Sequence, residues 1–528
     1  MNKWQLAGLS LLSGILLYAA WPVSPLTICI FFALIPLLLV ADNTRKHRSF
    51  FWYTFLALLA WNATTTWWIW NSTDVGSIAA IAANSLLMCL PWWGYHVFKT
   101  KFNKRIGYSA LITFWMLFEY IHLNWQLSWP WLTMGNVFAS HPGWVQWYEY
   151  TGAGGGTLWV LLTNIAIYEL VIAIKEKQQK GKRILVAAIF LFTPFIISLV
   201  VAPGAIWVLK PGRSATADNV LIIQPNIDPY GKFESSSIGQ QVQHFVTLSE
   251  QHMDSSTKLI IWPETAMSAG DAQQNTGTNS YYRPIFQFLM RHPGVTLLSG
   301  IETYKVYGTE KATPTAHLNS GMYMDEFNAA VNIKAGQPLQ YYYKMKLVPG
   351  VESLPTFLNF MAPVFEKFGG TAGGYGRDTG TKAFTVPGNP YVTAPVICYE
   401  SIYGEHVASY VSKGANILTI ITNDGWWGNT PGYKQHLQYA RLRAVETRRW
   451  VARSANTGTS AVIDNMGNLI ATQPWDTVAF IKYAIPVTTR KTIYVQYGDY
   501  LYEIASLLAL LMIIWNIVLW AGKRGIKK

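Results

Sequence analysis

The stretch Val396-Ile397-Cys398-Tyr399-Glu400 is the strongest indication of the fold of the second half of the chain. It closes an apolar run that begins at Tyr391 and is typical of a buried β-strand. Cys398 therefore stands where a strand ends, and a side chain there can project into a pocket at the edge of a sheet. A thiol in that place is a candidate nucleophile, although taken alone it is more simply read as part of the core.

Two further stretches also adjoin apolar runs. Trp262-Pro263-Glu264 follows one run, and Tyr343-Lys344-Met345-Lys346-Leu347-Val348-Pro349 contains two lysines. With Cys398 they supply a base, an oxyanion stabiliser and a nucleophile, which is the minimum for acyl transfer through a thioester. Taken singly, Glu264 is more simply a capping group. The two lysines would share one face of a strand, as at a solvated strand edge.

Strands and helices alternate around these stretches. The expected strands are 220–223, 258–262, 295–298, 391–397 and 416–422, and the expected helices are 236–253, 281–291, 401–412 and 432–448. A later pair of β-rich runs, 450–456 and 459–464, is joined by a turn at Asn456-Thr457-Gly458. The pattern predicts an α/β sandwich.

The rest of the chain has a membrane-like composition. Of the 528 residues, 51% are hydrophobic and 13% are charged, and the length calls for at least two domains. Apolar runs of bilayer-spanning length cover about 4–22, 24–41, 50–70, 75–98, 106–124, 154–174, 184–208 and 500–520. The sequence thus predicts about eight spans. Seven belong to a transmembrane domain 1–209, and the eighth lies in 500–528, after a soluble domain 210–499.

The basic residues beside these spans lie on one side. Seventeen Lys and Arg residues flank the first, second, fourth, sixth and eighth spans, whereas the loops near 23, 71–74 and 125–153 contain none. The positive-inside rule then predicts cytoplasmic termini and a large domain on the opposite side. The net charge of +13 is thereby explained by topology rather than by a nucleic-acid surface. The three cysteines, Cys29, Cys89 and Cys398, predict no disulfide framework.

Three segments leave alternatives open. Residues 1–22 also read as a signal peptide, but its removal would break the charge rule, which favours a retained span. The Trp-rich loop 125–153 is interpreted as an aromatic belt with turns, the alternative being a re-entrant segment that guides lipid. The glycine-rich segment 350–376 is expected to form mobile loops where substrates enter.

Residues 218–487 resemble the nitrilase superfamily, whose members carry a Glu–Lys–Cys triad on an αββα sandwich. With the predicted spans, the whole chain resembles the apolipoprotein N-acyltransferase family. The resemblance is carried most specifically by Thr422-Asn-Asp-Gly-Trp-Trp-Gly428, Gln435-His436-Leu437, residues 440–447 and Asn456-Thr-Gly-Thr-Ser460. It implies a polytopic α-helical membrane domain and an extracytoplasmic, nitrilase-like αββα sandwich.

The resemblance also implies roles for individual residues. Glu264 would be the general base and Cys398 the nucleophile. The family places its catalytic Lys five residues before the Pro of Leu-Val-Pro and eight before a second Glu, which selects Lys344 and Glu352 rather than Lys346.

Two further positions match the family site. Glu400, like Glu352, would support the thiol, the lysine or the intermediate, and Tyr399 would supply a backbone N–H and shape the pocket. The chain departs from the family pattern around Glu352, at Gln224-Pro225-Asn226-Ile227 and at Gln496. These departures leave the triad intact.

The activity implied is a two-step exchange. Cys398 would take an acyl chain from the sn-1 ester of a phospholipid, typically phosphatidylethanolamine, and form a thioester. The α-amine of diacylglyceryl-cysteine in a diacylated apolipoprotein would then accept the chain, with Glu264 moving the proton. No metal or organic cofactor is expected, and His406 and His436 read as structural. The location implied is the bacterial inner membrane, with a periplasmic catalytic domain.

Two other functions compete with this interpretation. A membrane-anchored amidase could use the same triad, but one or two spans would suffice to anchor it. A transporter with a non-catalytic outer domain is a different class, and the spans hold few ionisable residues of the kind that mark ion paths, Glu119 and Glu169 being the main exceptions.

Overall fold

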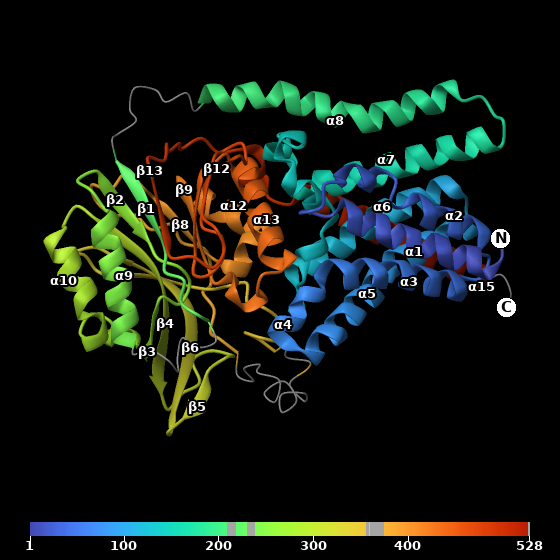
Figure 1. The fold of residues 1–528 in the computed structure, drawn as a ribbon. Helices are drawn as coiled ribbons and strands as arrows, with labels where there is room; N and C mark the ends of the chain where they lie inside the picture. The colour runs from blue at the N-terminus through green and yellow to red at the C-terminus, as the bar shows by residue number, and fades with distance from the viewer. Residues whose placement is uncertain (209–217, 230–237, 355–357, 359–373, 526–528) are drawn as a thin grey trace. The chain divides into compact units, whose positions relative to one another are not determined.

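The computed structural model describes residues 1–208, 218–229, 238–354, 358 and 374–525. The chain forms two compact units (Figure 1). The first contains Met1–Trp70, Val75–Val200 and Asp499–Lys528, and the second contains Asn71–Asp74 and Val201–Gly498. Most of the expected loop segment 350–376 lies outside the described residues.

The first unit is helical. Its principal helices are α1 (Lys3–Ala20), α2 (Ile35–Asn43), α3 (His47–Thr66), α5 (Val75–Lys101), α6 (Lys104–Asn124), α7 (Tyr148–Lys175), α8 (Gly181–Val208) and α15 (Tyr500–Gly525). Helix α1 packs on α3, α3 on α5, α5 on α6, and α6 on α15. An Asn2 cap begins α1, since its side-chain oxygen accepts a hydrogen bond from the Gln5 N–H over 2.9 Å.

Among the described residues, five helices are long and apolar enough to cross a membrane. They are α5, α6, α7, α8 and α15. The other three expected spans coincide with α1, with the pair of short helices within Thr27–Asn43, and with α3. The membrane character of the unit is therefore confirmed, and the count of eight spans stays a prediction.

The Trp-rich loop folds into three 3-10 helices, Pro130–Leu132, Met134–Ser140 and Pro142–Trp144. They bury side chains such as Trp131 inside the unit. The carboxylate of Glu119 on α6 accepts four hydrogen bonds, from Trp115 Nε1, Met134 N, Thr157 Oγ1 and Tyr502 OH, over 2.7–2.9 Å. This saturated, buried carboxylate ties α6, the loop, α7 and α15 together.

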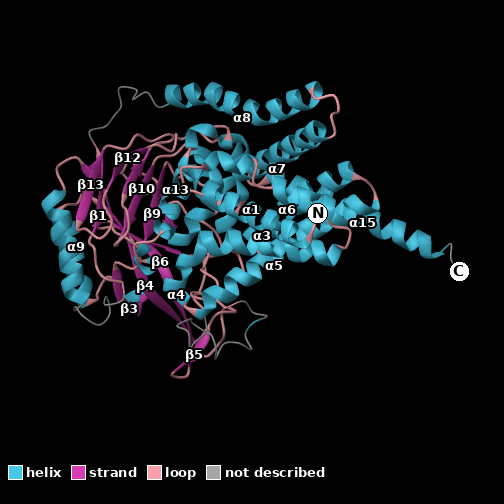
Figure 2. Ribbon diagram, turned by 45° about the vertical axis from the view of Figure 1, so that its right-hand side comes forward, coloured by secondary structure: helices cyan, strands magenta, loops and turns pink. Residues whose placement is uncertain are grey.

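The second unit contains two β-sheets, drawn in magenta in Figure 2. The first sheet has the order β13-β1-β2-β4-β6-β5, with β3 added on β4 and β7 on β6. Its strands are β1 (Asn219–Gln224), β2 (Thr257–Ile261), β3 (Met267–Ala272), β4 (Thr296–Gly308), β5 (His317–Asn319), β6 (Met322–Ile333), β7 (Gln340–Tyr343) and β13 (Ala479–Tyr483).

The second sheet has the order β12-β11-β10-β9-β8. Its strands are β8 (Thr393–Ile397), β9 (Ile417–Thr422), β10 (Val451–Ala455), β11 (Ala461–Ile463) and β12 (Leu469–Thr472). Strands β8, β9 and β10 are parallel, and β10 pairs antiparallel with β11 across the expected turn.

Four helices cover the sheets: α9 (Ile238–His252), α10 (Arg283–Arg291), α12 (Gly404–Ser412) and α13 (Pro431–Thr447). Alternate residues of β1 enter different cores, because Val220 joins the core that includes the second sheet, α12 and α13, whereas Leu221 joins the core with α9 and α10. Figure 1 shows α9 and α10 on one side of the strands and α12 and α13 on the other. The layers are therefore αββα, as predicted.

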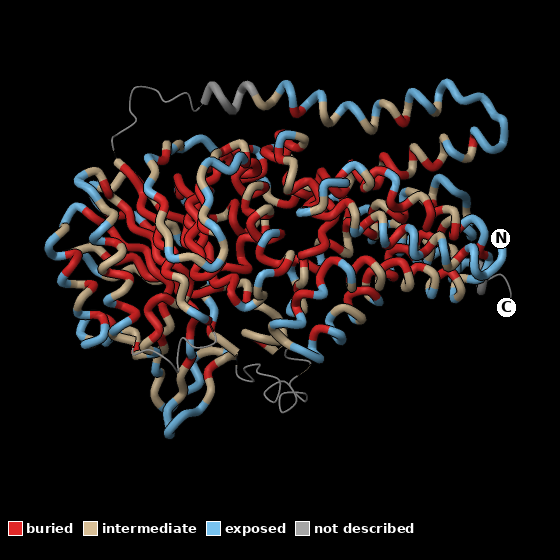
Figure 3. Tube along the Cα trace, viewed as in Figure 1, coloured by how far each residue is buried: buried red, intermediate tan, exposed pale blue. Residues whose placement is uncertain are grey.

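Both faces of the central strands are buried (Figure 3). Such strands read as continuous apolar runs, which is why the sequence revealed them. One local prediction was wrong: β7 ends at Tyr343, so Lys344 and Lys346 do not share the face of a strand. The chain leaves the ladder there because Met345 N–H and Lys346 N–H donate to Glu400 Oε1.

Candidate active site

Each candidate residue lies just after the C-terminal end of a β-strand. Strand β2 is parallel to β4, and β7 also runs with β4 because both are antiparallel to β6. Lys344 directly follows β7, and Glu264 lies three residues after β2. Cys398 directly follows β8 in the other sheet. Strand topology thus collects an amine, a carboxylate and a thiol from three distant parts of the chain.

Lys344 and Glu264 form a buried ion pair. The Lys344 ammonium lies 3.1 Å from Glu264 Oε1 and 2.7 Å from Glu352 Oε1. The lysine is only 1% exposed. Burial alone would lower its pKa, but the charges of Glu264 and Glu352 outweigh burial and hold the pKa of Lys344 well above its ordinary value. Lys344 is therefore a fixed cation at neutral pH.

Asn328 on β6 joins the two carboxylates. Its side-chain amide donates to Glu264 Oε1 over 2.8 Å and to Glu352 Oε1 over 3.0 Å, and its backbone carbonyl accepts from the backbone N–H of Lys344. Sequence reasoning missed this residue, because an Asn within a strand carries no signal of the partners that sheet pairing gives it. Glu352 is fixed further by the Val348 N–H, which donates to its Oε2 over 2.8 Å.

Cys398 occupies an unusual backbone position. Its φ is +48°, in the left-handed region, and it opens the 3-10 helix Cys398–Ile402. The thiol is buried. Burial and the Glu264 charge raise the pKa of Cys398 above its ordinary value, whereas Lys344 lowers it. The resting thiol is therefore protonated at neutral pH and needs a base before it can attack.

Glu264 has a second attachment, to the other sheet. Its Oε2 accepts a hydrogen bond from the Asn423 N–H over 3.1 Å, and Asn423 directly follows β9, the neighbour of β8. The backbone of Glu264 also packs tightly on Gly300, where an added Cβ would lie 2.3 Å from Thr265 N. The Asn423 contact was missed, although Asn423 stands in the specific stretch that begins at Thr422.

Glu400 links the lysine segment to the cysteine segment. Its Oε1 accepts from Tyr342 OH over 2.6 Å and from Met345 N over 2.7 Å, and its Oε2 accepts from Ile397 N over 2.9 Å. Burial alone would raise its pKa, but His406 and the hydrogen-bond donors lower the pKa of Glu400. A charged carboxylate thus holds the backbones before Cys398 and after Lys344 together.

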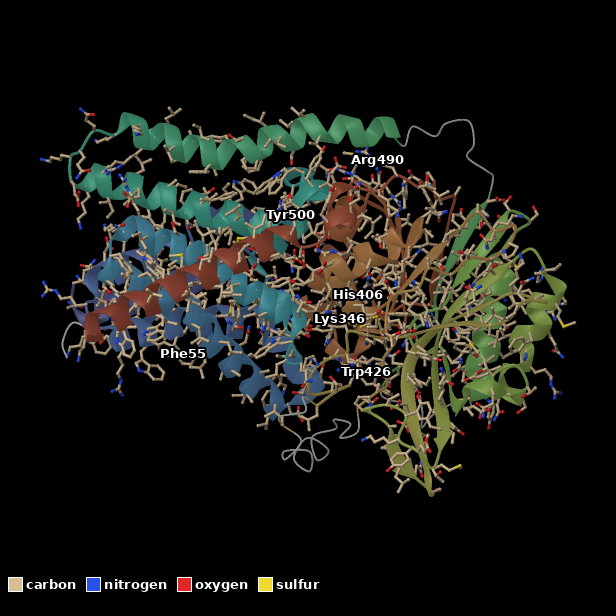
Figure 4. All side chains as sticks on the ribbon, turned by 180° about the vertical axis from the view of Figure 1, so that it is seen from behind. Phe55, Lys346, His406, Trp426, Arg490 and Tyr500 are labelled. Carbon is tan, nitrogen blue, oxygen red and sulfur yellow. The ribbon has the colours of Figure 1, made fainter. Side chains whose placement is uncertain are left out.

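The remaining predicted positions surround this centre. Tyr399 is buried and its ring contacts the Tyr403 ring edge-on at 5.4 Å. Lys346, labelled in Figure 4, places its ammonium 4.8 Å from the centre of the Tyr403 ring. His406 lies 3.2 Å from Glu400 Oε1. Within the described part of the chain, no group of three or more His, Cys, Asp or Glu side chains is arranged to hold a metal ion.

The αββα sandwich and its match to a family define the class. Residues 220–494 match the carbon-nitrogen hydrolase family, so the second unit is a domain of that class. Residues 13–166 match the apolipoprotein N-acyltransferase N-terminal domain.

Two relatives cover nearly the whole chain. The apolipoprotein N-acyltransferase of Chlorobaculum tepidum is 30% identical over 508 residues, 93% of this chain and 92% of the relative. That of Pasteurella multocida is 26% identical over 496 residues, 92% and 90% of the two chains. The chain belongs to the apolipoprotein N-acyltransferase family, and it is an acyltransferase of the nitrilase superfamily. The resemblance seen in the sequence is confirmed.

Proposed function

We propose that the chain transfers an acyl group from a phospholipid, through a thioester on Cys398, to the α-amine of N-terminal diacylglyceryl-cysteine in apolipoproteins. Family membership supports N-acylation of lipoproteins, and the site supports the thioester. The observation that carries the proposal is the buried Glu264–Lys344 ion pair, which follows β2 and β7 as Cys398 follows β8.

In the first half-reaction, Glu264 takes the thiol proton as sulfur attacks the sn-1 ester carbonyl. The resulting oxyanion faces the Lys344 ammonium and the backbone N–H of Tyr399. Collapse breaks the ester C–O bond, and Glu264 returns the proton to the departing lysophospholipid alkoxide. Glu352 keeps a second negative charge beside Lys344, so the lysine remains a cation while Glu264 gains and loses its proton.

In the second half-reaction, the α-amine of the diacylated lipoprotein attacks the thioester carbonyl. Glu264 accepts the amine proton, and collapse of the oxyanion breaks the C–S bond. The proton then passes to sulfur, which restores the resting thiol and leaves an amide-linked third acyl chain. The thioester keeps the acyl group on the protein between the two substrates, so no other carrier takes part.

The membrane unit gives the proposal its setting. The chain is a bacterial membrane protein, and we assign it to the inner membrane because its substrates are lipids and lipoproteins of that membrane. We also propose cytoplasmic termini and a periplasmic 210–499, between the spans of 1–209 and 500–528; the one-sided basic residues support this topology. Phosphatidylethanolamine is the expected donor.

Intact-mass spectrometry tests the proposal. The purified full-length protein is incubated with phosphatidylethanolamine, alongside a Cys398→Ala variant. An added acyl mass that hydroxylamine removes, absent from the variant, is expected, followed by its discharge onto a diacylated lipopeptide. An adduct that water discharges but the lipopeptide does not would favour a hydrolase, and no adduct with several phospholipids would refute the donor step.

A further inference from the structure

A second polar network lies behind Cys398 and plays no part in the steps above. It consists of Ser401 on the Cys398–Ile402 turn, Asp424, His436 on α13, and Arg453 on β10. All four side chains are at most 1% exposed. Groups this buried and this polar are costly unless their hydrogen bonds are made, so each of the four side chains depends on its partners in the network.

The network ends on the backbone carbonyl of the nucleophile. Cys398 O lies 2.8 Å from Ser401 Oγ and 3.1 Å from His436 Nε2, and those two side-chain atoms are 2.8 Å apart. At its other end, His436 Nδ1 lies 3.0 Å from Asp424 Oδ1 and 3.0 Å from Arg453 Nη2.

Asp424 is the anionic anchor of the network. Burial alone would raise its pKa, but Arg453 and His436 outweigh burial and lower the pKa of Asp424 to about 2. Arg453 Nη2 approaches both carboxylate oxygens, at 3.0 and 2.8 Å. An added Cβ on Gly458 would lie 2.3 Å from Asp424 Oδ2, so the backbone also confines the carboxylate.

The available hydrogens determine which atoms of the network are donors and which are acceptors. Three close contacts join Ser401 Oγ, His436 Nε2 and Cys398 O, and the serine hydroxyl supplies one hydrogen. The carbonyl can only accept, so a hydrogen bond over its 3.1 Å contact with Nε2 is donated by Nε2, and Nδ1 on the other side of the ring can accept from Arg453 Nη2 over 3.0 Å. This is the reverse of a hydrolase Ser–His–Asp triad, in which Nε2 accepts from the serine. Ser401 and His436 are thus donors that hold Cys398 O.

Holding this carbonyl also orients the next N–H. Within the described chain the peptide bonds are trans, so the Cys398 carbonyl and the Tyr399 N–H point in opposite directions in one rigid plane. The left-handed φ of Cys398 is uncommon for a residue with a side chain, and the plane needs restraint to stay there. Two donors on the carbonyl provide that restraint.

We propose that Ser401 and His436 are positioning residues that fix the Cys398–Tyr399 peptide so that the Tyr399 N–H serves the oxyanion of acyl transfer. The inference rests on the proposed function, because an oxyanion forms only if Cys398 attacks a carbonyl. It assigns His436 a role in catalysis through Cys398, beyond the purely structural role that the sequence suggested.

Two rates on the full-length enzyme in detergent test this role. Acylation of Cys398 by phosphatidylethanolamine passes through an oxyanion, whereas alkylation of the same thiol by iodoacetamide does not. The variants are Ser401→Ala, His436→Asn and His436→Gln, with His252→Gln as a matched histidine control on α9. The Asn amide reaches only the position of Nδ1, whereas the Gln amide reaches that of Nε2 and can donate to Cys398 O.

In Ser401→Ala and His436→Asn, acylation is expected to slow by about ten- to a hundredfold, while alkylation changes less than about threefold. His436→Gln should recover part of the loss, and His252→Gln should match the unsubstituted enzyme. Equal losses in both rates, or no loss of acylation in Ser401→Ala, would overturn the inference. If iodoacetamide alkylates the unsubstituted enzyme but phosphatidylethanolamine forms no thioester on it, the proposed function is refuted. The inference, which depends on that function, is then refuted as well.

Discussion

The backbone N–H of Asn423 donates a hydrogen bond to Glu264 Oε2 over 3.1 Å, and this bond joins the two sheets of the sandwich. Asn423 follows β9 in one sheet, and Glu264 follows β2 in the other. The carboxylate proposed as the base is thus held from one side by Asn423 and from the other by Lys344 and Asn328. Its position depends on how closely the sheets are packed.

Glu264→Gln should abolish transfer while the fold persists. The amide cannot accept the thiol proton, so formation of the Cys398 acyl adduct is expected to fall by about a hundred- to ten-thousandfold. Intact-mass spectrometry over time measures this rate. Glu250→Gln, at an exposed ion pair with Arg291, is the control. Acylation within a few-fold of the unsubstituted rate in Glu264→Gln would contradict the assignment of the base.

Titration of the Cys398 thiol should reveal the Glu264 charge. Because burial and Glu264 raise the thiol pKa above its ordinary value of 9.0, the folded protein keeps its proton where an unfolded thiol loses it. The difference in ultraviolet thiolate absorbance between the unsubstituted protein and Cys398→Ser should therefore show no step near pH 9.0. In Glu264→Gln the step should move to lower pH.

The same shift has a consequence for stability. Above the unfolded pKa the unfolded chain releases the Cys398 proton and the folded chain does not, so alkaline pH favours unfolding. Cys398→Ser should lose less stability than the unsubstituted protein as the pH rises past that value. A rise in Cys398 thiolate absorbance at or below the ordinary thiol pKa would contradict the burial of this thiol.

Gly300→Ala should displace the backbone that carries Glu264 while leaving the Glu264 side chain itself unchanged. The new Cβ would lie 2.3 Å from Thr265 N and 2.6 Å from Glu264 Cα, so the segment carrying the carboxylate must move. A destabilisation of about 1–3 kcal/mol and a loss of acylation of at least about tenfold are expected. Gly294→Ala, with nothing within 4 Å of the new Cβ, is the matched control. Thermal unfolding and the acylation rate provide the two measurements.

Glu400→Gln should weaken the link between the lysine and cysteine segments. Its Oε1 and Oε2 together accept from Tyr342 and from three backbone N–H groups, and an amide would turn one acceptor into a donor facing them. The expected cost is about 2–4 kcal/mol of stability, with slower acylation. Glu310→Gln, at an exposed position, is the control. Unchanged stability in Glu400→Gln would show that these hydrogen bonds are not needed.

Much of the sandwich could be predicted because its central strands are apolar on both faces and stand out as continuous runs. Glu264, Lys344 and Cys398 could be nominated because each follows such a run. The choice of Lys344 over Lys346 needed a family spacing, since both lysines adjoin the same strand.

The sequence did not reveal the residues whose contacts depend on which strands and helices lie next to each other in the fold. Asn328 reaches two carboxylates only because β6 lies between β4 and β7, and the order of strands is not local information. Likewise, His436 reaches Cys398 O because α13 packs on the Cys398–Ile402 turn. Eight apolar runs could be counted, but the length and hydropathy of the described helices support five of them as spans.

The four hydrogen bonds to the Glu119 carboxylate come from residues that are synthesised at different times. Three of its four donors, Trp115, Met134 and Thr157, are synthesised early, whereas the fourth, Tyr502, belongs to the last helix. A carboxylate within a membrane helix is costly until its partners are in place. The catalytic unit is therefore translated while this site is still incomplete, and α15 supplies the last hydrogen bond to Glu119 when it packs into the membrane unit. A ribosome that stops before Tyr502 leaves behind a helix bundle that lacks the final donor to its buried acid.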